Sequence, residues 1–333
     1  MTQKKLNLLF AGQDLKFMKE IIHFFKEDSQ FIVEVDEWSG HTRHDEGKSR
    51  KLLKWADIII AEWCLGNAVW YSKHKQPHQK LFIRFHRHEM NTTYPEQLHL
   101  RNVDKIVFIA PAIKSLIESR LALPKEKSIL IYNAVPVKKF NLQKQPNANY
   151  QIGMIGYSPK LKRPDRAFAL LNELKKYDER YRLHIKGAHP STYPWLWRNP
   201  SERQYYDQLF HEIKSSGHND SLLFEQWGTD IPEWLQKIGF ILSVSDIEGS
   251  HQAVAEGMAS GSIPFITGWK GSEEIYPQKF IKSSLEEMAA GINDYTKNSQ
   301  LYFDEQRAVK EFCENNFDLA VIYTKWRELI SSN

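Results

Sequence analysis

Ile152-Gly153-Met154-Ile155-Gly156 is a short apolar run in the middle of the chain, and it starts a second series of strands. The segment 165–176 that follows carries apolar residues at helical spacing, and residues 183–187 form another strand-like run. Just before the first run, residues 143–150 are polar and contain proline, which is typical of a linker. The sequence therefore predicts a domain boundary at this point.

Similar apolar runs continue outward from this boundary in both directions. On the amino-terminal side they lie at residues 6–11, 31–35, 58–60, 81–83, 106–108 and 129–132. On the carboxyl-terminal side they lie at residues 222–224, 240–243 and 263–266. Near-continuous apolar strands that alternate with helical stretches favour parallel sheets covered on both faces. We therefore predict an α/β protein with two Rossmann-like, doubly wound domains facing a cleft, at residues 1–145 and 151–312.

One segment does not follow this alternation. Residues 188–208 are dense in proline, tryptophan and tyrosine, and we expect an inserted loop or an irregular helix there. No internal repeat of 20 to 50 residues interrupts the pattern elsewhere.

Composition excludes several classes of protein. A length of 333 residues suits about two domains at ~150 residues each, and 41% hydrophobic residues with a net charge of +4 exclude intrinsic disorder. The two cysteines, Cys64 and Cys313, are far apart and encode neither a disulfide framework nor a zinc site. Because no window approaches 18 consecutive apolar residues, we expect a cytoplasmic protein, and peripheral contact with the inner face of the membrane stays open.

The stretch 243–264 contains the main candidate binding residues of the second domain. A strand ends near Ser243, a loop contains Glu248, and a helix containing Glu256 begins near Ser250. Backbone N–H groups of Gly249, Ser250 and His251 would lie at the positive end of that helix. Such groups provide what a diphosphate needs for binding.

This stretch resembles the Glu-x7-Glu motif of retaining glycosyltransferases with the GT-B fold, in particular family 4. The resemblance implies that Glu248 lies beside the donor sugar and that Glu256 contacts the ribose hydroxyls. The family loop usually reads Glu-Gly-Phe-Gly, whereas this chain has Glu248-Gly249-Ser250-His251. Whether His251 reaches a sugar hydroxyl or phosphate, or is only a polar neighbour of the helix cap, stays open.

A basic turn, Tyr157-Ser158-Pro159-Lys160-Leu161-Lys162-Arg163-Pro164-Asp165, resembles the family's phosphate-binding turn. Lys162 matches the family lysine, which implies a catalytic role in neutralising the departing diphosphate. Tyr157 stands where the family has arginine, so Lys160 or Arg163 is the candidate to replace it. No Asp-x-Asp occurs in the chain, and we expect neither a metal nor a cofactor.

Further segments extend the resemblance. Residues 227–234 are similar to the turn beside the nucleotide base, which implies contacts at Thr229 and Ile231. Residues 104–140 resemble the last strand-helix-strand of the acceptor domain, and the helix within residues 313–333 would return to that domain.

Residues of the first domain are candidates for the acceptor side. His86 occupies the position of a cleft histidine in related enzymes, and the neighbouring Arg84 and Arg87 suit an anionic acceptor. Gly12 and Gln13 follow the first strand, where glycine would let a substrate approach the backbone.

The resemblance implies a retaining, metal-independent glycosyltransferase that moves a sugar from a UDP- or GDP-sugar to a glycan or lipid-linked acceptor. A role in bacterial surface polysaccharide synthesis fits such an activity. A sugar-nucleotide epimerase of the same fold is the nearest alternative. A nucleic-acid-binding protein is a different class, which the spread of charge along the chain disfavours, so no nucleic-acid partner is expected.

Overall fold

The computed structural model describes residues 4–217 and 220–331, so both ends of the chain, 1–3 and 332–333, lie outside the described residues. Contacts within the chain divide it into two units. The first unit extends to Ala134 and resumes at Asn316, and the second comprises Val135–Asn315. The segment 143–150 therefore belongs to the second unit.

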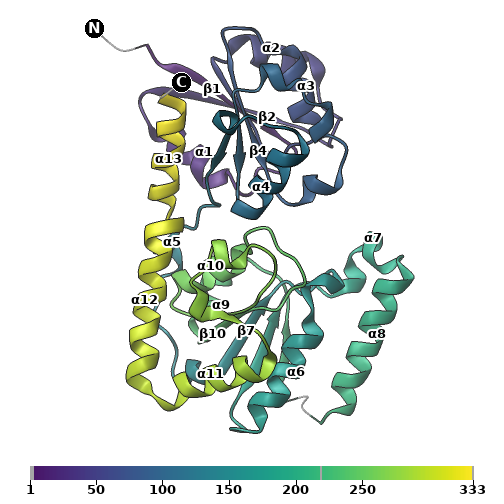
Figure 1. The fold of residues 1–333 in the computed structure, drawn as a ribbon, viewed down its shortest axis with the longest axis vertical. Helices are drawn as coiled ribbons and strands as arrows, with labels where there is room; N and C mark the ends of the chain where they lie inside the picture. Colours follow the sequence, from purple (N-terminus) through teal and green to yellow (C-terminus); the bar gives the residue numbers. More distant parts are fainter. Residues whose placement is uncertain (1–3, 218–219, 332–333) are drawn as a thin grey trace. The chain divides into compact units, whose positions relative to one another are not determined.

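The first unit is built on a six-stranded parallel sheet with the order β2-β1-β3-β4-β5-β6. Its strands are β1 (Leu6–Gly12), β2 (Phe31–Glu37), β3 (Ile58–Ala61), β4 (Lys80–Phe85), β5 (Lys105–Phe108) and β6 (Ser128–Leu130). Its helices are α1 (Lys19–Glu27), α2 (Glu46–Trp55), α3 (Gly66–His74), α4 (Pro111–Arg120) and α13 (Leu319–Ser331). Figure 1 shows α1 and α13 on one face of this sheet and α2, α3 and α4 on the other.

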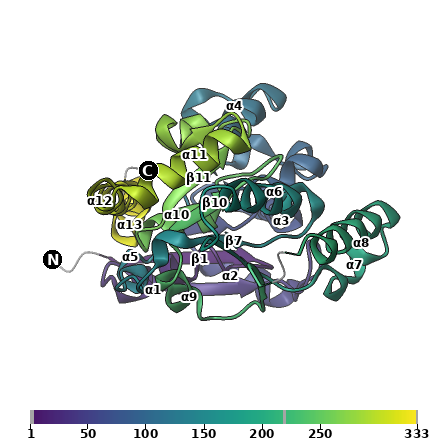
Figure 2. The same cartoon turned by 90° about the horizontal axis from the view of Figure 1, so that it is seen from below.

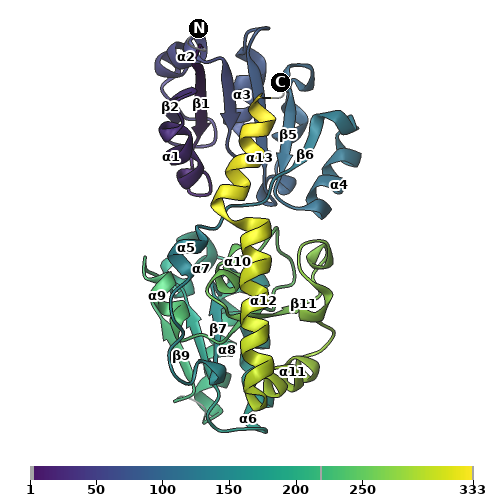
Figure 3. The same cartoon turned by 90° about the vertical axis from the view of Figure 1, so that its left-hand side faces the viewer.

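The carboxyl-terminal helix α13 is part of the core of the first unit, although its sequence lies at the opposite end of the chain. Ile322 and Trp326 on α13 pack in one buried cluster with Ile21 and Phe25 of α1. Figure 3 shows α13 lying across this sheet beside α1. Because the Trp326 side chain is fully buried, truncating it to alanine would cost about 3–5 kcal/mol of folding free energy.

The second unit repeats this architecture with the strand order β12-β11-β10-β7-β8-β9. Its strands are β7 (Gln151–Ile155), β8 (Arg182–Lys186), β9 (Leu222–Glu225), β10 (Phe240–Ser243), β11 (Ile263–Thr267) and β12 (Ile281–Lys282). Its helices are α5 (Val137–Phe140), α6 (Pro164–Lys175), α7 (Pro194–Trp197), α8 (Pro200–Ser215), α9 (Ile231–Gln236), α10 (Gln252–Ala259), α11 (Leu285–Lys297) and α12 (Ser299–Phe317), the last of which crosses the boundary at Asn316. Helix α6 packs against α11, whereas α5 packs against α9 and α10 (Figure 2). The predicted pair of doubly wound α/β sheets is confirmed.

Helix α10 lies unusually close to its strand, and this closeness sets the position of its amino-terminal end. A β-carbon added at Gly257 would lie 2.7 Å from Cγ2 of Ile241 on β10. Only glycine fits that distance without a shift of the helix. The sequence of α10 therefore fixes how near its first turn comes to the carboxyl end of β10.

Two sequence-based expectations need correction. Residues 188–208 were expected to be irregular, but most of them lie in α7 and the regular helix α8. Asn199 caps α8 by accepting from Ser201 N, and Pro200 stands at the first helical position, as helix starts favour. The high content of aromatic residues concealed buried positions at helical spacing: Tyr206, Leu209 and Ile213.

Residues 143–150 do not form a linker between the two units, because they belong to the second unit. Lys144 is anchored inside the second unit, where its ammonium group donates to Leu235 O, Ile238 O and the hydroxyls of Ser260 and Ser262. Burial lowers the pKa of Lys144 well below its ordinary value, with a further contribution from Lys310. A segment whose half-buried lysine makes four such hydrogen bonds is part of the packed unit.

Within residues 4–217 and 220–331, no helix is both long enough and apolar enough to span a membrane.

Candidate functional site

Two loops meet at the centre of the second sheet. Neighbouring strands β7 and β10 are followed by connections that lead to opposite sides of the sheet, to β8 and β11. In open α/β sheets, ligands bind outside the carboxyl ends of the strands at such a switch point. The loop 156–163 follows β7 and the loop 244–251 follows β10, and the N–H of Asp246 donates to Leu161 O at 2.8 Å. The backbone itself therefore ties the two loops together.

Lys162 and Glu248, which lie 86 positions apart in sequence, form an ion pair across these loops. The Nζ of Lys162 is 2.5 Å from Oε1 of Glu248, and the Ser245 hydroxyl donates to the same oxygen at 2.6 Å. The Glu248 side chain is only 9% exposed. The structure thus brings together Lys162 and Glu248, two of the predicted catalytic residues, of which His86 is the third, and it adds Ser245, which the sequence analysis had not singled out.

The environment of Glu248 favours its ionised form. Burial alone would raise the pKa of this carboxyl, but His251, Lys162 and the hydrogen bonds from Lys162 and Ser245 lower it to about 2. Burial lowers the pKa of His251 to about 4, so His251 is neutral at pH 7. At neutral pH, Lys162 is therefore the cation that stabilises Glu248.

His251 lies at the start of α10 with its side chain turned inward. It occupies the N-cap position, but its ring makes no capping hydrogen bond. Nδ1 of His251 lies 2.6 Å from Oγ of Ser243, and Nε2 lies 3.7 Å from Oε1 of Glu248. His251 is thus at the helix cap without capping it by its side chain, and a contact of His251 with a sugar hydroxyl or phosphate stays a prediction.

The other basic residues of the turn have different partners. Arg163 forms ion pairs with Asp165 and Asp246, at 2.7 and 3.0 Å, and so bridges the two loops. Lys160 instead binds the Ser201 hydroxyl of α8 at 2.6 Å. Of these two candidates to replace the family arginine, Arg163 lies in the two-loop network and Lys160 is directed toward α8.

Glu256 lies on the second turn of α10 and is partly exposed. Burial of its carboxyl raises its pKa to about 7, while a side-chain hydrogen bond with Gln252 acts in the opposite direction. Glu256 is therefore close to half ionised at neutral pH. Gly249 and Ser250 form the bend before the helix, where Ser250 O accepts a hydrogen bond from the Tyr276 hydroxyl at 2.6 Å.

The predicted base-binding turn lies after β9. Thr229 is exposed and Ile231 begins α9. Between them, Asp230 pairs with Lys186 at the end of β8, at 2.7 Å. A lysine at the carboxyl end of a strand was the available signal for this pair, and the sequence analysis missed it.

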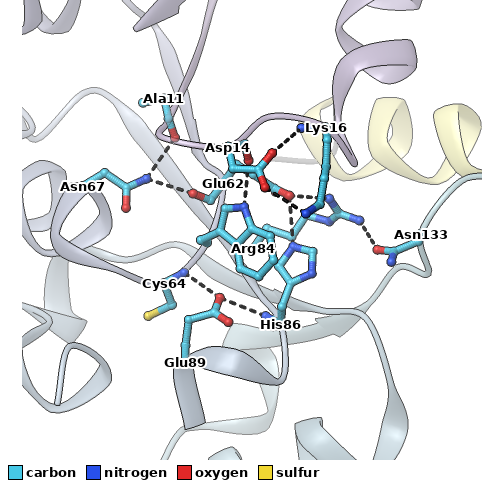
Figure 4. A network of polar contacts seen from close by, with 11 residues as sticks. Ala11, Asp14, Lys16, Glu62, Cys64, Asn67, Arg84, His86, Glu89 and Asn133 are labelled. Carbon is cyan, nitrogen blue, oxygen red and sulfur yellow. Dashed lines mark hydrogen bonds and ion pairs between the residues drawn. The ribbon is translucent and has the colours of Figure 1, made fainter. Parts of the chain in front are cut away.

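The first unit contains a separate cluster of buried charges at the carboxyl ends of β3 and β4 (Figure 4). Oε1 of Glu62 accepts from Nη1 of Arg84 at 2.8 Å and lies 2.9 Å from Nε2 of His86. Arg84 also donates to the side-chain oxygen of Asn133. Burial would raise the pKa of Glu62, but Arg84 and His86 lower it below its ordinary value.

Arg84 is therefore not available to an anionic acceptor, which corrects the sequence-based expectation. Its side chain is only 1% exposed and its charge is used by Glu62. The signal for Glu62 in the sequence was a charged residue directly after a buried strand. Arg87 is partly buried and belongs to no ion pair among the described residues.

His86 lies in this cluster beside two aromatic rings, which also contact each other. The Trp63 ring stacks on it with centroids 3.9 Å apart, and the Phe17 ring stacks at 5.3 Å. The backbone N–H of His86 donates to Glu89, which also accepts from the N–H of Cys64. The orientation of the imidazole is thus fixed by the carboxylate of Glu62 and by stacking.

Gly12 and Gln13 end the first strand of the same unit. A β-carbon at Gly12 would lie 2.9 Å from the carbonyl oxygen of Glu62, so this backbone contact requires the glycine. Gln13 is exposed.

We compared the chain with known protein families, curated proteins and solved structures. A scan against protein-family profiles and a search of curated proteins both gave no match. Among solved structures, Anabaena Alr3699/HepE in complex with UDP-glucose is similar, with a TM-score of 0.73 and 15% identity over 98% of this chain and 100% of that chain. A glycosyltransferase from Rickettsia africae has a TM-score of 0.72 and 15% identity, covering 98% of each chain.

The sucrose-phosphate synthase of Thermosynechococcus elongatus is also similar, with a TM-score of 0.70 and 12% identity over 99% of this chain and 100% of that chain. At these identities the likeness shows the fold alone. It confirms the predicted GT-B architecture of two Rossmann-like α/β units.

Proposed function

We propose that this protein is a glycosyltransferase that transfers a sugar from a nucleotide diphosphate sugar to a glycan or lipid-linked acceptor. The observation that carries the proposal is the pairing of Lys162 with Glu248 at the switch point of the second sheet. The sequence resemblance had identified both residues independently of the structure. Similarity to HepE, whose structures contain UDP and UDP-glucose, makes a UDP-sugar the first donor to test and a GDP-sugar the second.

In this proposal, Lys162 and the first turn of α10 hold the diphosphate. Lysine provides a fixed positive charge where negative charge accumulates as the nucleotide departs, and the helix start provides N–H groups with the same polarity. These groups supply charge without a metal, so we propose metal-independent transfer. Glu256 would accept from the ribose hydroxyls, which its partial exposure on α10 permits.

We propose that transfer retains the anomeric configuration. The Glu248–Glu256 spacing resembles that of retaining enzymes, in which the departing phosphate accepts the proton of the attacking hydroxyl from the same face. Glu248, kept ionised beside Lys162, would then stabilise positive charge on the donor sugar. His86 would orient or polarise the acceptor hydroxyl, because its ring is held rigidly by Glu62, Trp63 and Phe17.

The proposed setting is the cytoplasmic synthesis of bacterial surface polysaccharide, with peripheral membrane contact where the acceptor is lipid-linked. This part of the proposal follows from the resemblance and from the acceptor class that it implies.

A thermal-shift panel tests the donor assignment directly. UDP, GDP, UDP-glucose, UDP-N-acetylglucosamine and GDP-mannose are each added to wild type and to the Lys162→Ala variant. A ligand at 100 times its dissociation constant stabilises the folded protein by ~2.7 kcal/mol, and we expect one nucleotide series to do so in wild type only. Stabilisation by none of the five would refute the proposal.

Product analysis separates the alternatives. Transfer requires an acceptor, whereas an epimerase would release epimerised or free sugar from the donor alone. Salt-dependent binding of an oligonucleotide, without any sugar-nucleotide affinity, would instead support nucleic-acid binding.

A further inference from the structure

His251 has an unusual backbone conformation for a residue with a side chain. Its φ is +41° and its ψ is +74°, in the left-handed region that glycine adopts more easily. Its side chain is nevertheless 6% exposed, because the ring turns beneath the loop that carries Glu248. A strained backbone combined with a buried polar ring indicates that the ring has a specific role at this position.

The hydrogen bonds around His251 determine which ring nitrogen carries the proton. Trp269 Nε1 donates to Ser243 Oγ at 2.9 Å, and an indole nitrogen can only donate. The Ser243 hydroxyl is then free to donate its own proton to Nδ1 of His251, 2.6 Å away. Ser243 Oγ has a second lone pair and could also accept from Nδ1–H, but that tautomer would turn the Nε2 lone pair toward Oε1 of Glu248. The neutral ring is therefore favoured with its proton on Nε2.

This Nε2–H group is buried and has no hydrogen-bond partner within the part of the chain that the structure describes. The anion that it faces is Oε1 of Glu248, at 3.7 Å. A closer approach of ~0.7 Å would reach the ~3.0 Å of a normal N–H···O hydrogen bond. His251 is thus a donor held just outside hydrogen-bonding distance of the carboxylate.

We propose that His251 is a positioning residue. Its Nε2–H group would donate a hydrogen bond to the Glu248 carboxylate, in place of Lys162, when Lys162 turns to the diphosphate. The inference rests on the proposed function, because a bound diphosphate is what would draw Lys162 away. Without Lys162, the Ser245 hydroxyl would be the only hydrogen-bond donor left to Glu248 among those described. A buried carboxylate with a single neutral donor is costly, and the Nε2–H group supplies a second one.

The remaining groups around His251 do not compete for this role. Ser243, which faces Nδ1, and Trp269, which donates to Ser243, are both uncharged. The Tyr276 hydroxyl contacts the backbone oxygen of His251 at 3.3 Å rather than its ring. Lys162 and Glu248 are therefore the charges that act on the His251 ring, with opposite effects on its pKa.

The first experiment tests this arrangement without any nucleotide. Nitrogen-15 NMR of histidine side chains assigns the tautomer and the pKa of His251, whose signal is identified by its loss in His251→Gln. We expect a neutral ring protonated on Nε2 in wild type. In Lys162→Ala, Glu248 should move onto Nε2, and the pKa of His251 should rise by about one unit or more, because a nearby positive charge has been removed.

Lys160→Ala is the matched control. Its ammonium group binds Ser201 on α8, so its removal should leave the titration of His251 unchanged. A ring protonated on Nδ1 in wild type, or an unchanged pKa in Lys162→Ala, would overturn the inference.

The second experiment uses the full enzyme with the sugar nucleotide found in the thermal-shift panel. His251→Gly removes the side chain and suits the positive φ, so it is expected to fold, and His251→Gln restores an N–H donor. We expect kcat to fall about tenfold to a hundredfold in His251→Gly, with KM for the donor little changed and partial recovery in His251→Gln.

Loss of kcat in His251→Gly should also be non-additive with Glu248→Gln, because the ring would act through that carboxylate. Full kcat in His251→Gly, with intact donor binding by wild type, would refute the positioning role and leave the proposed function standing. If wild type binds no sugar nucleotide, the proposed function fails, and the NMR experiment alone decides whether His251 replaces Lys162 at Glu248.

Discussion

Substituting Glu256 by glutamine should stabilise the free protein at alkaline pH while it weakens nucleotide binding. Burial raises the pKa of Glu256 from its ordinary 4.5 to about 7. The folded state binds the proton of the Glu256 carboxyl more tightly than the unfolded chain does. The contribution of this group to the free energy of unfolding is therefore fully present below pH 4.5 and is lost as the pH rises through 7. The difference of 2.5 pKa units corresponds to at most ~3.4 kcal/mol, and partial exposure reduces this to about 2–3 kcal/mol.

Urea unfolding followed by tryptophan fluorescence measures this effect. Wild type, Glu256→Gln and the control Glu311→Gln, an exposed position on α12, are compared at pH 5 and pH 8. We expect the free energy of unfolding of Glu256→Gln to exceed that of wild type by about 2–3 kcal/mol at pH 8 and by less than ~1 kcal/mol at pH 5. The control variant should have the same free energy of unfolding as wild type at both pH values.

The same variant should bind nucleotide less well if Glu256 contacts the ribose. Loss of a charged hydrogen bond costs about 1.5–3 kcal/mol, which calorimetry would detect as a ~10- to 150-fold weaker UDP affinity. An equal advantage of Glu256→Gln at both pH values would refute the burial argument, and unchanged UDP affinity would refute the ribose contact.

The remaining predictions concern the other residues of the two sites. Lys162→Ala should lower kcat about 10²- to 10³-fold with little change in acceptor KM, and wild type should keep full activity in EDTA; a strict need for Mg²⁺ or Mn²⁺ would contradict this. Proton NMR of the product should show the donor's α configuration, with measurable activity in His86→Ala, and a β-linked product would contradict retention. Because the pKa of Glu248 is held at about 2, its contribution to stability is present above pH 4.5 and lost as the pH falls toward 2, so Glu248→Gln should flatten acid unfolding by up to about 3 kcal/mol. Tyr205→Phe removes the hydroxyl that bonds Asp165 at 2.5 Å and should cost about 1 kcal/mol in urea unfolding, whereas an unchanged midpoint would show that α8 does not support the basic turn.

Much of the fold could be predicted from the sequence because its signals are local. Central parallel strands such as β3 and β10 are buried on both faces and therefore appear as continuous apolar runs, here residues 58–60 and 240–243. The two-residue strand β12 and the helix α8 escaped prediction for the opposite reason. One is too short to carry a pattern, and the other mixes aromatic and polar residues so that its buried face is visible only against its neighbours.

The residue types of the candidate site were also visible in the sequence. Lys162, Glu248 and Glu256 stand at positions where strands end and helices begin, and the order of elements determines that these positions share one edge of a sheet. Sequence order alone therefore determined which side chains could meet.

The partners of those side chains were decided by tertiary structure. Arg84 pairs with Glu62 rather than with an acceptor, Lys144 donates to carbonyl and hydroxyl groups of the second unit, and the ring of His251 turns inward to Glu248. The first two outcomes depend on contacts between residues that are 22 and 91 positions apart, and the ring of His251 is held by Ser243, which Trp269 binds from 26 positions away. Charge, burial and hydrogen bonding from distant segments select the direction that each side chain takes, and none of them is a property of the local sequence.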